Sequence, residues 1–163
     1  MSLFINVKLS LLLHNSIMHK PKEIRVLALG VIQKGNRIFL SQGYDPVKQE
    51  IFYRAMGGGV EFGETSYEAL KREFQEEIAA ELTNIQYLGC LESLFTFNGK
   101  PGHEIIQLYA CDFVDSKFYE QETITFAEKD REKTALWVDI ERCKSGELRV
   151  VPEVFFEYLN KQV

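Results

Sequence analysis

The sequence has no run of basic residues, and its acidic residues outnumber the basic ones. Its 163 residues include 19 Lys and Arg against 24 Asp and Glu, which gives a formal net charge of −5. Domains that bind nucleic acids carry a basic patch or stripe that neutralises the backbone phosphates. We therefore expect no dedicated nucleic-acid surface, and we expect the partner of this chain to be a small molecule.

The sequence has few cysteines, and their spacing does not indicate that they share a disulfide or a metal site. The three cysteines, Cys90, Cys111 and Cys143, are odd in number and far apart, and no Cys-x-x-Cys motif occurs. This pattern is not that of a disulfide framework. We interpret all three as buried free thiols in a reducing compartment, and we expect the protein to be cytoplasmic.

No hydrophobic run is long enough to span a membrane. The apolar stretch at residues 9–13 is far shorter than the roughly 20 residues that a transmembrane helix needs. It also lacks the small-residue cleavage site of a signal peptide. Residues 1–22 are therefore interpreted as an N-terminal extension. This extension would be an extra strand, a segment covering a partner subunit in a homodimer, or residues partly of artificial origin.

Residues 23–163 are predicted to form one domain. The chain is 45% apolar and 26% charged, as in soluble globular proteins, and it is long enough to bury a single core. Hydrophobic patterns predict strands at residues 24–33, 37–41, 51–56, 85–97, 104–113 and 135–138. Loops are expected at residues 43–49 and 116–133. Besides one central helix, short helices are expected from Asp139 to Gly146 and from Pro152 to Leu159.

Residues 58–80 carry the most specific pattern in the chain. Thr65 and Glu68 form a Thr-x-x-Glu capping box, which predicts that the central helix begins near Ser66. A helix turns by 100° per residue, so apolar residues three and four positions apart share one face. The stripe that we expect to face the core consists of Leu70, Phe74 and Ile78.

Three glutamates, Glu73, Glu76 and Glu77, lie beside this stripe at helical spacing. Carboxylates on a half-buried face repel one another, and without a counter-charge at least one would have a raised pKa. Oxygen-only ligands suit Mg²⁺ or Mn²⁺. Because Mg²⁺ is typically shared with substrate phosphates, the pattern indicates a phosphate ester or anhydride as substrate. The alternative interpretation is an acidic, solvated helix face with Glu–Arg pairs.

The same stretch resembles the signature of the Nudix hydrolases. The matching residues are Gly58, Glu64, Arg72, Glu73, Phe74, Glu76 and Glu77. Ala79 and Ala80 depart from the signature at its last two positions, where a glycine and an aliphatic residue are usual. The resemblance implies the fold of that family, an α/β/α sandwich with a mixed β-sheet.

The resemblance also implies roles for the matching residues. Glu73, Glu76 and Glu77 would bind Mg²⁺ or Mn²⁺, and the carbonyl of Gly58 would be a further ligand. Glu64 and Arg72 would form the pair that ties the loop to the helix. Glu64 is in addition a candidate metal ligand, and Arg72 belongs to the catalytic set.

Ala79 stands where the family usually has a helix-ending glycine. We expect the helix to run on through Ala79 and Ala80 to Leu82, with Asn84 able to take the left-handed stop. A glycine at position 79 would then weaken the helix, because glycine is a poor helix former.

A general base for the attacking water is expected outside the box. In several Nudix members it comes from a later loop, and Glu128 is the first candidate because Phe126 and Ala127 give the 116–133 loop an apolar anchor. Glu104, at the start of a rigid strand, is the second. For each of them a solvated carboxylate is the alternative. Glu122 and Glu132, in the same loop, are further candidates for the general base.

The aromatic residues are a weaker indication of the binding site. Tyr44, Phe52, Tyr53, Phe95 and Phe97 could stack on a nucleobase, but aromatic residues in strands usually belong to the core. Trp137 is predicted to be a core residue.

Together these observations predict a metal-dependent hydrolase. Its substrate would be a nucleoside diphosphate linked to another moiety, and water would attack phosphorus in the diphosphate linkage. One alternative is a nucleotide-binding regulator without catalysis, against which the intact carboxylate set argues. Another is a prenyl-diphosphate isomerase, which has a related box but needs a catalytic cysteine.

Overall fold

The computed structural model describes residues 22–128 and 131–159. The predicted N-terminal extension, residues 1–22, lies outside this range except for Lys22, so its role stays a prediction. Within the described residues, no helix is long and apolar enough to cross a membrane.

The first sheet has four strands in the order β5-β1-β7-β6. Strand β1 (Arg25–Val31) pairs in parallel with β7 (Lys100–Phe113) and antiparallel with β5 (Met56–Gly59). The outer strand β6 (Leu82–Phe97) runs antiparallel to β7 and has register shifts near Gly89. The sheet is therefore mixed, and its outer strand is irregular at these shifts.

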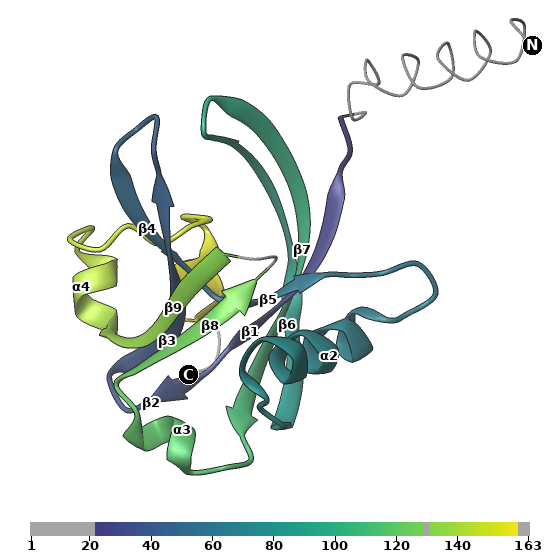
Figure 1. The fold of residues 1–163 in the computed structure, drawn as a ribbon, viewed down its shortest axis with the longest axis vertical. Helices are drawn as coiled ribbons and strands as arrows, with labels where there is room; N and C mark the ends of the chain where they lie inside the picture. Colours follow the sequence, from purple (N-terminus) through teal and green to yellow (C-terminus); the bar gives the residue numbers. More distant parts are fainter. Residues whose placement is uncertain (1–21, 129–130, 160–163) are drawn as a thin grey trace, which may run out of the picture.

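The second sheet is antiparallel and has five strands. Its main order is β2 (Gln33–Lys34), β3 (Arg37–Asp45), β9 (Arg131–Asp139) and β8 (Thr123–Glu128), and β4 (Glu50–Arg54) also pairs with β3. The hairpins β3–β4 and β6–β7 extend beyond the rest of the fold and face each other (Figure 1).

Helices α2 and α4 lie at opposite sides of the fold (Figure 1). Helix α2 (Ser66–Ile78) packs on β1, β5 and β8, whereas α4 (Ile140–Lys144) contacts β9 and α5 (Phe155–Leu159) contacts β6. A short α3 (Lys117–Glu120) precedes β8. The predicted α/β/α sandwich with a mixed sheet is confirmed.

Strand β1 divides the core in two because its side chains alternate between the two faces of the sheet. Ala28 belongs to the hydrophobic cluster that contains Leu70 and Phe74 of α2. The neighbouring side chains Leu27 and Leu29 belong to the second cluster, which contains residues of α4 and α5. The predicted core face of α2 is thus the observed one.

Trp137 is buried, as predicted, and packs against Phe39 and Tyr119. Its indole Nε1 donates to the carbonyl of Phe118 at 3.0 Å. The expectation for the cysteines is wrong in one case. Cys111 and Cys143 are buried, but Cys90 on the outer strand β6 is exposed.

The expectation of a loop at residues 116–133 is wrong. These residues include α3, the whole of β8 and the start of β9. Strand β8 buries only Phe126 fully, so its sequence lacks the strong alternation that would reveal a strand. Pairing with β9 holds it in place instead. Similarly, the expected 43–49 loop is shorter, because β3 continues to Asp45.

The predicted end of the central helix is also wrong. Helix α2 ends at Ile78, and Ala79 takes the left-handed conformation with φ 52° and ψ 39°. This conformation costs an alanine roughly 1–2 kcal/mol. The turn places Ala80 and Leu82 in the core with 1% and 8% exposure, so burial of the following residues offsets the strain. Asn84 is left-handed too, but it lies within β6.

Candidate active site

Helix α2 begins where the capping box predicts. The backbone N–H of Glu68 donates to Thr65 Oγ1 at 3.2 Å, and the Glu68 carboxylate accepts from the Thr65 backbone N–H at 2.8 Å. The bond from the Thr65 backbone N–H, together with one from the Thr65 hydroxyl to the same carboxylate, lowers the pKa of Glu68. The reciprocal pair satisfies two backbone donors and fixes the first turn, which sets the direction of every later side chain on the helix.

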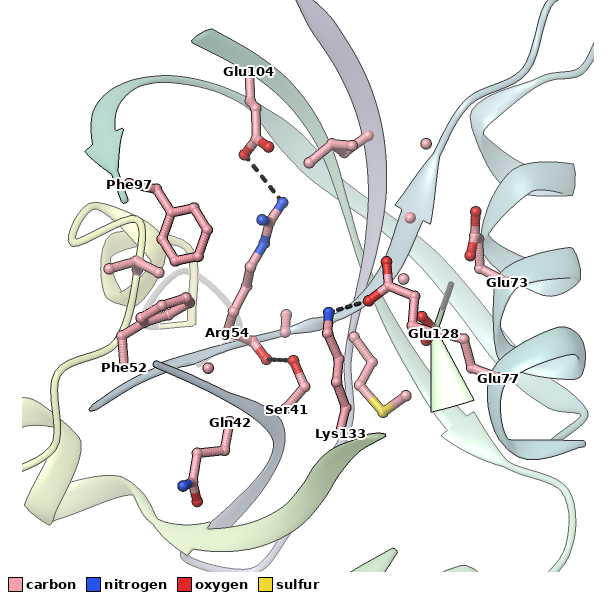
Figure 2. A pocket seen from close by; sticks show the side chains of 18 of the residues that line it. Ser41, Gln42, Phe52, Arg54, Glu73, Glu77, Phe97, Glu104, Glu128 and Lys133 are labelled. Atoms are coloured by element: carbon pink, nitrogen blue, oxygen red, sulfur yellow. Dashed lines mark hydrogen bonds and ion pairs between the residues drawn. The ribbon is translucent and has the colours of Figure 1, made fainter. Parts of the chain in front are cut away.

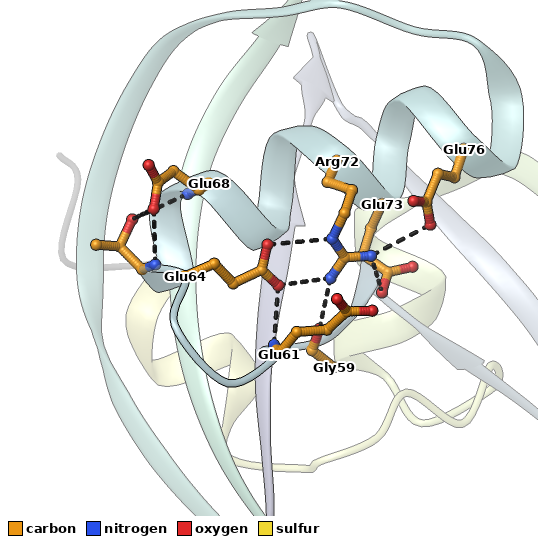
Figure 3. A network of polar contacts seen from close by, with 8 residues as sticks. Gly59, Glu61, Glu64, Glu68, Arg72, Glu73 and Glu76 are labelled. Carbon is orange, nitrogen blue, oxygen red and sulfur yellow. Dashed lines mark hydrogen bonds and ion pairs between the residues drawn. The ribbon is translucent and has the colours of Figure 1, made fainter.

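Arg72 lies at the centre of a polar network that we call the Arg72 cluster, with Glu64, Glu73 and Glu76 (Figure 3). Its guanidinium donates to both oxygens of Glu64 at 2.7 and 3.1 Å. Its Nη1 donates to Glu73 at 3.0 Å and to Glu76 at 3.2 Å. The hydrogen bonds with Glu64 raise the pKa of Arg72 and lower the pKa of Glu64. The predicted pairing of Glu64 with Arg72 is observed.

The same arginine ties the helix to the glycine loop. Arg72 Nη2 donates to the carbonyl of Gly59 at 2.9 Å. Next to it, a Cβ on Gly58 would lie 2.2 Å from the carboxylate carbon of Glu73. Only glycine allows this approach, which brings the Gly58 backbone against a carboxylate on the helix.

Glu77 shows the effect of crowded negative charge. Burial, followed by the charges of Glu128 and Glu73, raises the pKa of Glu77 from its ordinary 4.5 to about 8. Lys133 opposes this shift and forms an ion pair with Glu128. The expectation that at least one box carboxylate would have a raised pKa is confirmed. Figure 2 shows Glu73, Glu77 and Glu128 close to one another.

These groups open into a cleft of about 1020 Å³. Its walls include the glycine loop, the three box glutamates, the facing ends of β8 and β9, and the hairpins β3–β4 and β6–β7. Glu104 and Glu128 also line it, whereas Glu64 does not. The fold therefore brings the predicted carboxylates to one cleft except for Glu64 and Glu122, and Glu122 forms an ion pair with Arg37 instead.

Glu104 belongs to a second charged group, the Arg54 cluster of Glu104, Arg54 and Arg25. Its side chain is 5% exposed and accepts from Arg54 Nη2 at 3.1 Å and from Arg25 Nη1 at 3.5 Å. Figure 2 shows Glu104 directed toward Arg54 and away from Glu73. Burial lowers the pKa of Arg54, and the charge of Glu104 opposes that shift. Arg54 lines the cleft between the box carboxylates and the hairpins.

The aromatic residues separate into different environments. Tyr53 packs against the core, and Phe95 covers Gly102 on the neighbouring strand. Phe52 and Phe97 stand against each other in the wall of the cleft. Tyr44 is 53% exposed at the same end.

The sequence did not single out Arg54, Arg25 or Lys133. Each of them lies on a strand, and no spacing rule links Arg25 and Arg54 to Glu104. One sequence feature could have indicated that Arg54 lies near the site: it is the last residue of the strand that precedes the glycine loop. None of the cysteines lines the cleft among the described residues, and burial raises the pKa of Cys111 to about 12.

Within residues 22–128 and 131–159, no three His, Cys, Asp or Glu side chains converge into a ready-made metal site. Arg72 accounts for part of this arrangement, because it draws both Glu73 and Glu76 to one guanidinium nitrogen. The donors that could hold a cation are therefore adjacent but not gathered around one point.

Three solved structures with a similar fold are each distant from this chain in sequence. A NUDIX hydrolase from Nitrosomonas europaea has 16% identity and a TM-score of 0.60, over 86% of this chain and 88% of that one. A MutT protein from Bacillus halodurans has 17% identity and a TM-score of 0.57, over 83% and 80%. A MutT NUDIX hydrolase from Burkholderia pseudomallei has 22% identity and a TM-score of 0.55, over 74% and 86%.

These likenesses support the fold. No curated protein matches the chain by sequence. Family assignment therefore depends on the match to the family model described as the NUDIX domain, which covers residues 21–159. Because that match spans most of the sequence and includes the whole glycine loop and α2, the chain belongs to the Nudix hydrolase superfamily.

Proposed function

We propose that the protein is a divalent-metal-dependent hydrolase that cleaves a diphosphate linkage in a nucleoside diphosphate joined to another moiety. Membership of the Nudix superfamily supports a hydrolase acting on diphosphates in general. The finer proposal depends on one observation: Glu73 and Glu77 face a large cleft, and burial and charge crowding raise the pKa of Glu77 to about 8.

The residues present suit Mg²⁺ or Mn²⁺. The donors are all oxygen atoms, from the carboxylates of Glu73, Glu76 and Glu77 and the carbonyl of Gly58. The backbone of Gly58 lies against the carboxylate of Glu73, and we propose its carbonyl as the fourth donor. A cation would also relieve the repulsion at Glu77. When bound, it would supply charge neutralisation on phosphoryl oxygens and a more acidic water.

The chain's own residues then have separate tasks. Arg72 holds the glycine loop against α2 through Gly59 and Glu64, which positions the donors. It also engages Glu73 and Glu76, so it orients them toward the cleft side of the helix. For Glu64 we propose this positioning role, since it is turned toward Arg72 and the Glu61 backbone N–H.

For the general base we propose Glu128. It lines the cleft close enough to Glu77 to raise the pKa of that residue, and its ion pair with Lys133 fixes its orientation. Glu104 is engaged by two arginines and is directed away from Glu73, so it is less well placed to contact the attacking water. Water attack on phosphorus would transfer a proton to Glu128 and release two phosphate-bearing products.

The other functions weighed from the sequence have less support. A prenyl-diphosphate isomerase needs a catalytic cysteine, and no cysteine lines the cleft in the described part of the chain. A regulator without catalysis would not require the crowded carboxylates, whose mutual repulsion is costly unless a cation offsets it.

The decisive experiment is a substrate screen with Mg²⁺ or Mn²⁺ in ¹⁸O-labelled water. Nucleoside triphosphates, ADP-ribose, dinucleoside polyphosphates and nucleotide sugars are each incubated with the protein and with the Glu77→Gln variant. We expect the wild type to cleave at least one compound, with ¹⁸O in one phosphate product, and the variant to be at least a hundredfold slower. Absence of any cleaved diphosphate, or a metal-independent reaction, would overturn the proposal.

A further inference from the structure

The end of the cleft opposite α2 is built by the tips of two hairpins. Phe52 of β4 and Phe97 of β6 line the cleft there, with ring centroids 5.9 Å apart and ring planes at 81°. Figure 2 shows both rings on one side of Arg54, with Glu73 and Glu77 on the other side. The cleft thus presents, in order, an aromatic corner formed by Phe52 and Phe97, a guanidinium, and a group of carboxylates.

Each ring of the aromatic corner is held in position. Phe52 lies over Gly43 of the neighbouring strand, where a Cβ would come within 2.3 Å of the ring. Glycine therefore leaves room for the ring against the backbone of β3. Phe97 packs its neighbour edge to face, and 37% of its surface stays exposed. An ordered aromatic face that remains exposed in a cleft is suited to stacking.

A buried carboxylate ties the two hairpins together. Asp45 is 3% exposed and accepts from the backbone N–H groups of Val47 and Lys48 in its own turn and of Asn98 in the other turn. Burial acts to raise the pKa of Asp45, but these backbone donors bring it below its usual value. Lys48 Nζ also donates to the carbonyl of Thr96 at 2.7 Å. The aromatic corner is therefore preorganised.

The surroundings of the corner favour a ring with polar edges over a hydrocarbon tail. Lys48 and the ion pair of Arg149 with Glu50 line the same end of the cleft. An aliphatic chain would desolvate these charges without replacing their hydrogen bonds. A nucleobase has two apolar faces for stacking and a rim of donors and acceptors for the charged neighbours.

Building on the proposed diphosphate hydrolysis, we infer that Phe52 and Phe97 form the nucleobase-binding site of this cleft. The base of a nucleoside di- or triphosphate stacks on the aromatic corner, and Arg54 contacts the phosphate nearest the ribose. The remaining phosphates extend toward the α2 carboxylates. Glu104, which holds Arg54 from behind, acts as a positioning residue.

The test compares ligands that differ only by the nucleoside. Isothermal titration with Mg²⁺ measures the dissociation constants of methylene-bridged analogues of the four common nucleoside triphosphates, of inorganic tripolyphosphate and of geranyl diphosphate. The variants are Phe97→Ala, Phe52→Leu and Phe97→Trp. Tyr87→Leu is the matched control, because Tyr87 is a 53% exposed aromatic strand residue outside the cleft.

We expect Phe97→Ala to weaken binding of at least one nucleotide analogue tenfold or more relative to tripolyphosphate. Phe52→Leu should weaken the same analogue, Phe97→Trp should restore its binding to within threefold, and Tyr87→Leu should leave the ratio unchanged. An unchanged ratio in both Phe97→Ala and Phe52→Leu would overturn the inference. So would an equal loss in Tyr87→Leu, or a loss confined to geranyl diphosphate, which would assign the corner to a hydrocarbon tail.

The binding measurement separates this inference from the proposed function. If the wild type binds nucleotides more tightly than tripolyphosphate through Phe97 but cleaves none of them, diphosphate hydrolysis fails and the base site stands. If the wild type cleaves a diphosphate but binds nucleotides no more tightly than tripolyphosphate, the base site fails and hydrolysis stands.

Discussion

The two arginine clusters in the cleft have opposite charge balances. In the Arg72 cluster one guanidinium contacts three carboxylates, Glu64, Glu73 and Glu76, so the group carries a net negative charge. In the Arg54 cluster one carboxylate contacts two guanidinium groups, so the group carries a net positive charge. One end of the cleft is therefore suited to cations, and its middle is suited to a phosphate.

The clusters also differ in how the chain assembles them. The Arg72 cluster comes from one loop and the helix that follows it, so its members lie within 13 residues of Arg72. The Arg54 cluster joins three strands, and Glu104 is 79 residues from Arg25 and 50 from Arg54. This difference shows that similar ion pairs in one cleft can have a local or a long-range origin. The experiments below test whether the two clusters serve different steps.

The largest expected effect is at the negative cluster. Glu76 is 60% exposed and contacts only Arg72 within the cluster, so Glu76→Gln should change stability by less than about 1 kcal/mol. Turnover should fall at least a hundredfold, because a proposed metal ligand is lost. The control is Glu81→Gln, an exposed glutamate just past the helix. More than a tenth of wild-type turnover at saturating Mg²⁺ would contradict the ligand assignment.

A second pair of variants separates, by the kinetic parameter that each changes, the proposed base Glu128 beside the box carboxylates from Glu104 in the Arg54 cluster. Glu128→Gln should lower kcat about a hundredfold and change the pH–rate profile, as expected for a general base. Glu104→Gln should mainly raise KM, by about tenfold, because Arg54 loses the carboxylate that orients it. The opposite assignment, with kcat lost in Glu104→Gln alone, would make Glu104 the base. If both variants keep wild-type kcat, a box carboxylate or the metal ion activates the water.

Metal should stabilise the negative cluster. At a hundredfold excess of Mg²⁺ over its dissociation constant, linkage predicts about 2.7 kcal/mol of stabilisation. For a chain of this size the melting temperature should rise by about 5–11 °C after chelator treatment and metal addition. NaCl at matched ionic strength is the control, and Glu76→Gln should reduce the shift. A melting temperature that ignores both Mg²⁺ and Mn²⁺ would argue against metal binding in the cleft.

Glu77 lies beside the Arg72 cluster on α2, and its pKa gives this end of the cleft a pH dependence. In the metal-free protein this pKa is about 8, above the ordinary value of 4.5, so the folded state retains a proton that the unfolded chain releases. Its contribution to stability is therefore complete below about pH 4.5 and is lost as the pH rises toward 8. Metal must displace that proton, so apparent Mg²⁺ affinity should rise by up to about tenfold per pH unit and level off above pH 8.

Titration calorimetry at several pH values in two buffers measures both the affinity and the proton release. Glu77→Gln removes the titrating group, so its weaker metal binding should vary much less across this range. Equal pH dependence in the variant and the wild type would assign the proton to another group.

The smallest expected effect concerns the helix that carries the negative cluster. Ala79 is left-handed and exposed, so Ala79→Gly should relieve strain and stabilise the protein by about 0.5–1 kcal/mol. Ala69→Gly, at a buried position near the start of the same helix, should destabilise it by about 1 kcal/mol. Urea denaturation of the two variants measures both effects. A loss of stability in Ala79→Gly would mean that the helix continues past Ile78.

Much of the Arg72 cluster could be predicted from the sequence, because its members are close together along the chain. The capping box fixes the start of α2, and the 3.6-residue period then fixes which side chains share a face. That start sets the directions of Arg72, Glu73 and Glu76 on the helix, and the glycine loop shortly precedes it in the sequence. Where the helix stops could not be predicted in the same way. The turn at Ala79 is set by the burial of Ala80 and Leu82 against distant strands, which local propensity does not report.

The sequence by itself determined the family signature, the start and core face of α2, and the carboxylates on its cleft side, since these depend on residues within a few helical turns. Only the tertiary structure decided that Glu104 meets Arg25 and Arg54 and that Phe52 meets Phe97. The parallel pairing of β1 with β7 sets Arg25 opposite Glu104, and Asp45 joins the two hairpins that carry the aromatic rings. Such contacts depend on strand register and on chain packing across the whole domain, and no short-range pattern encodes them.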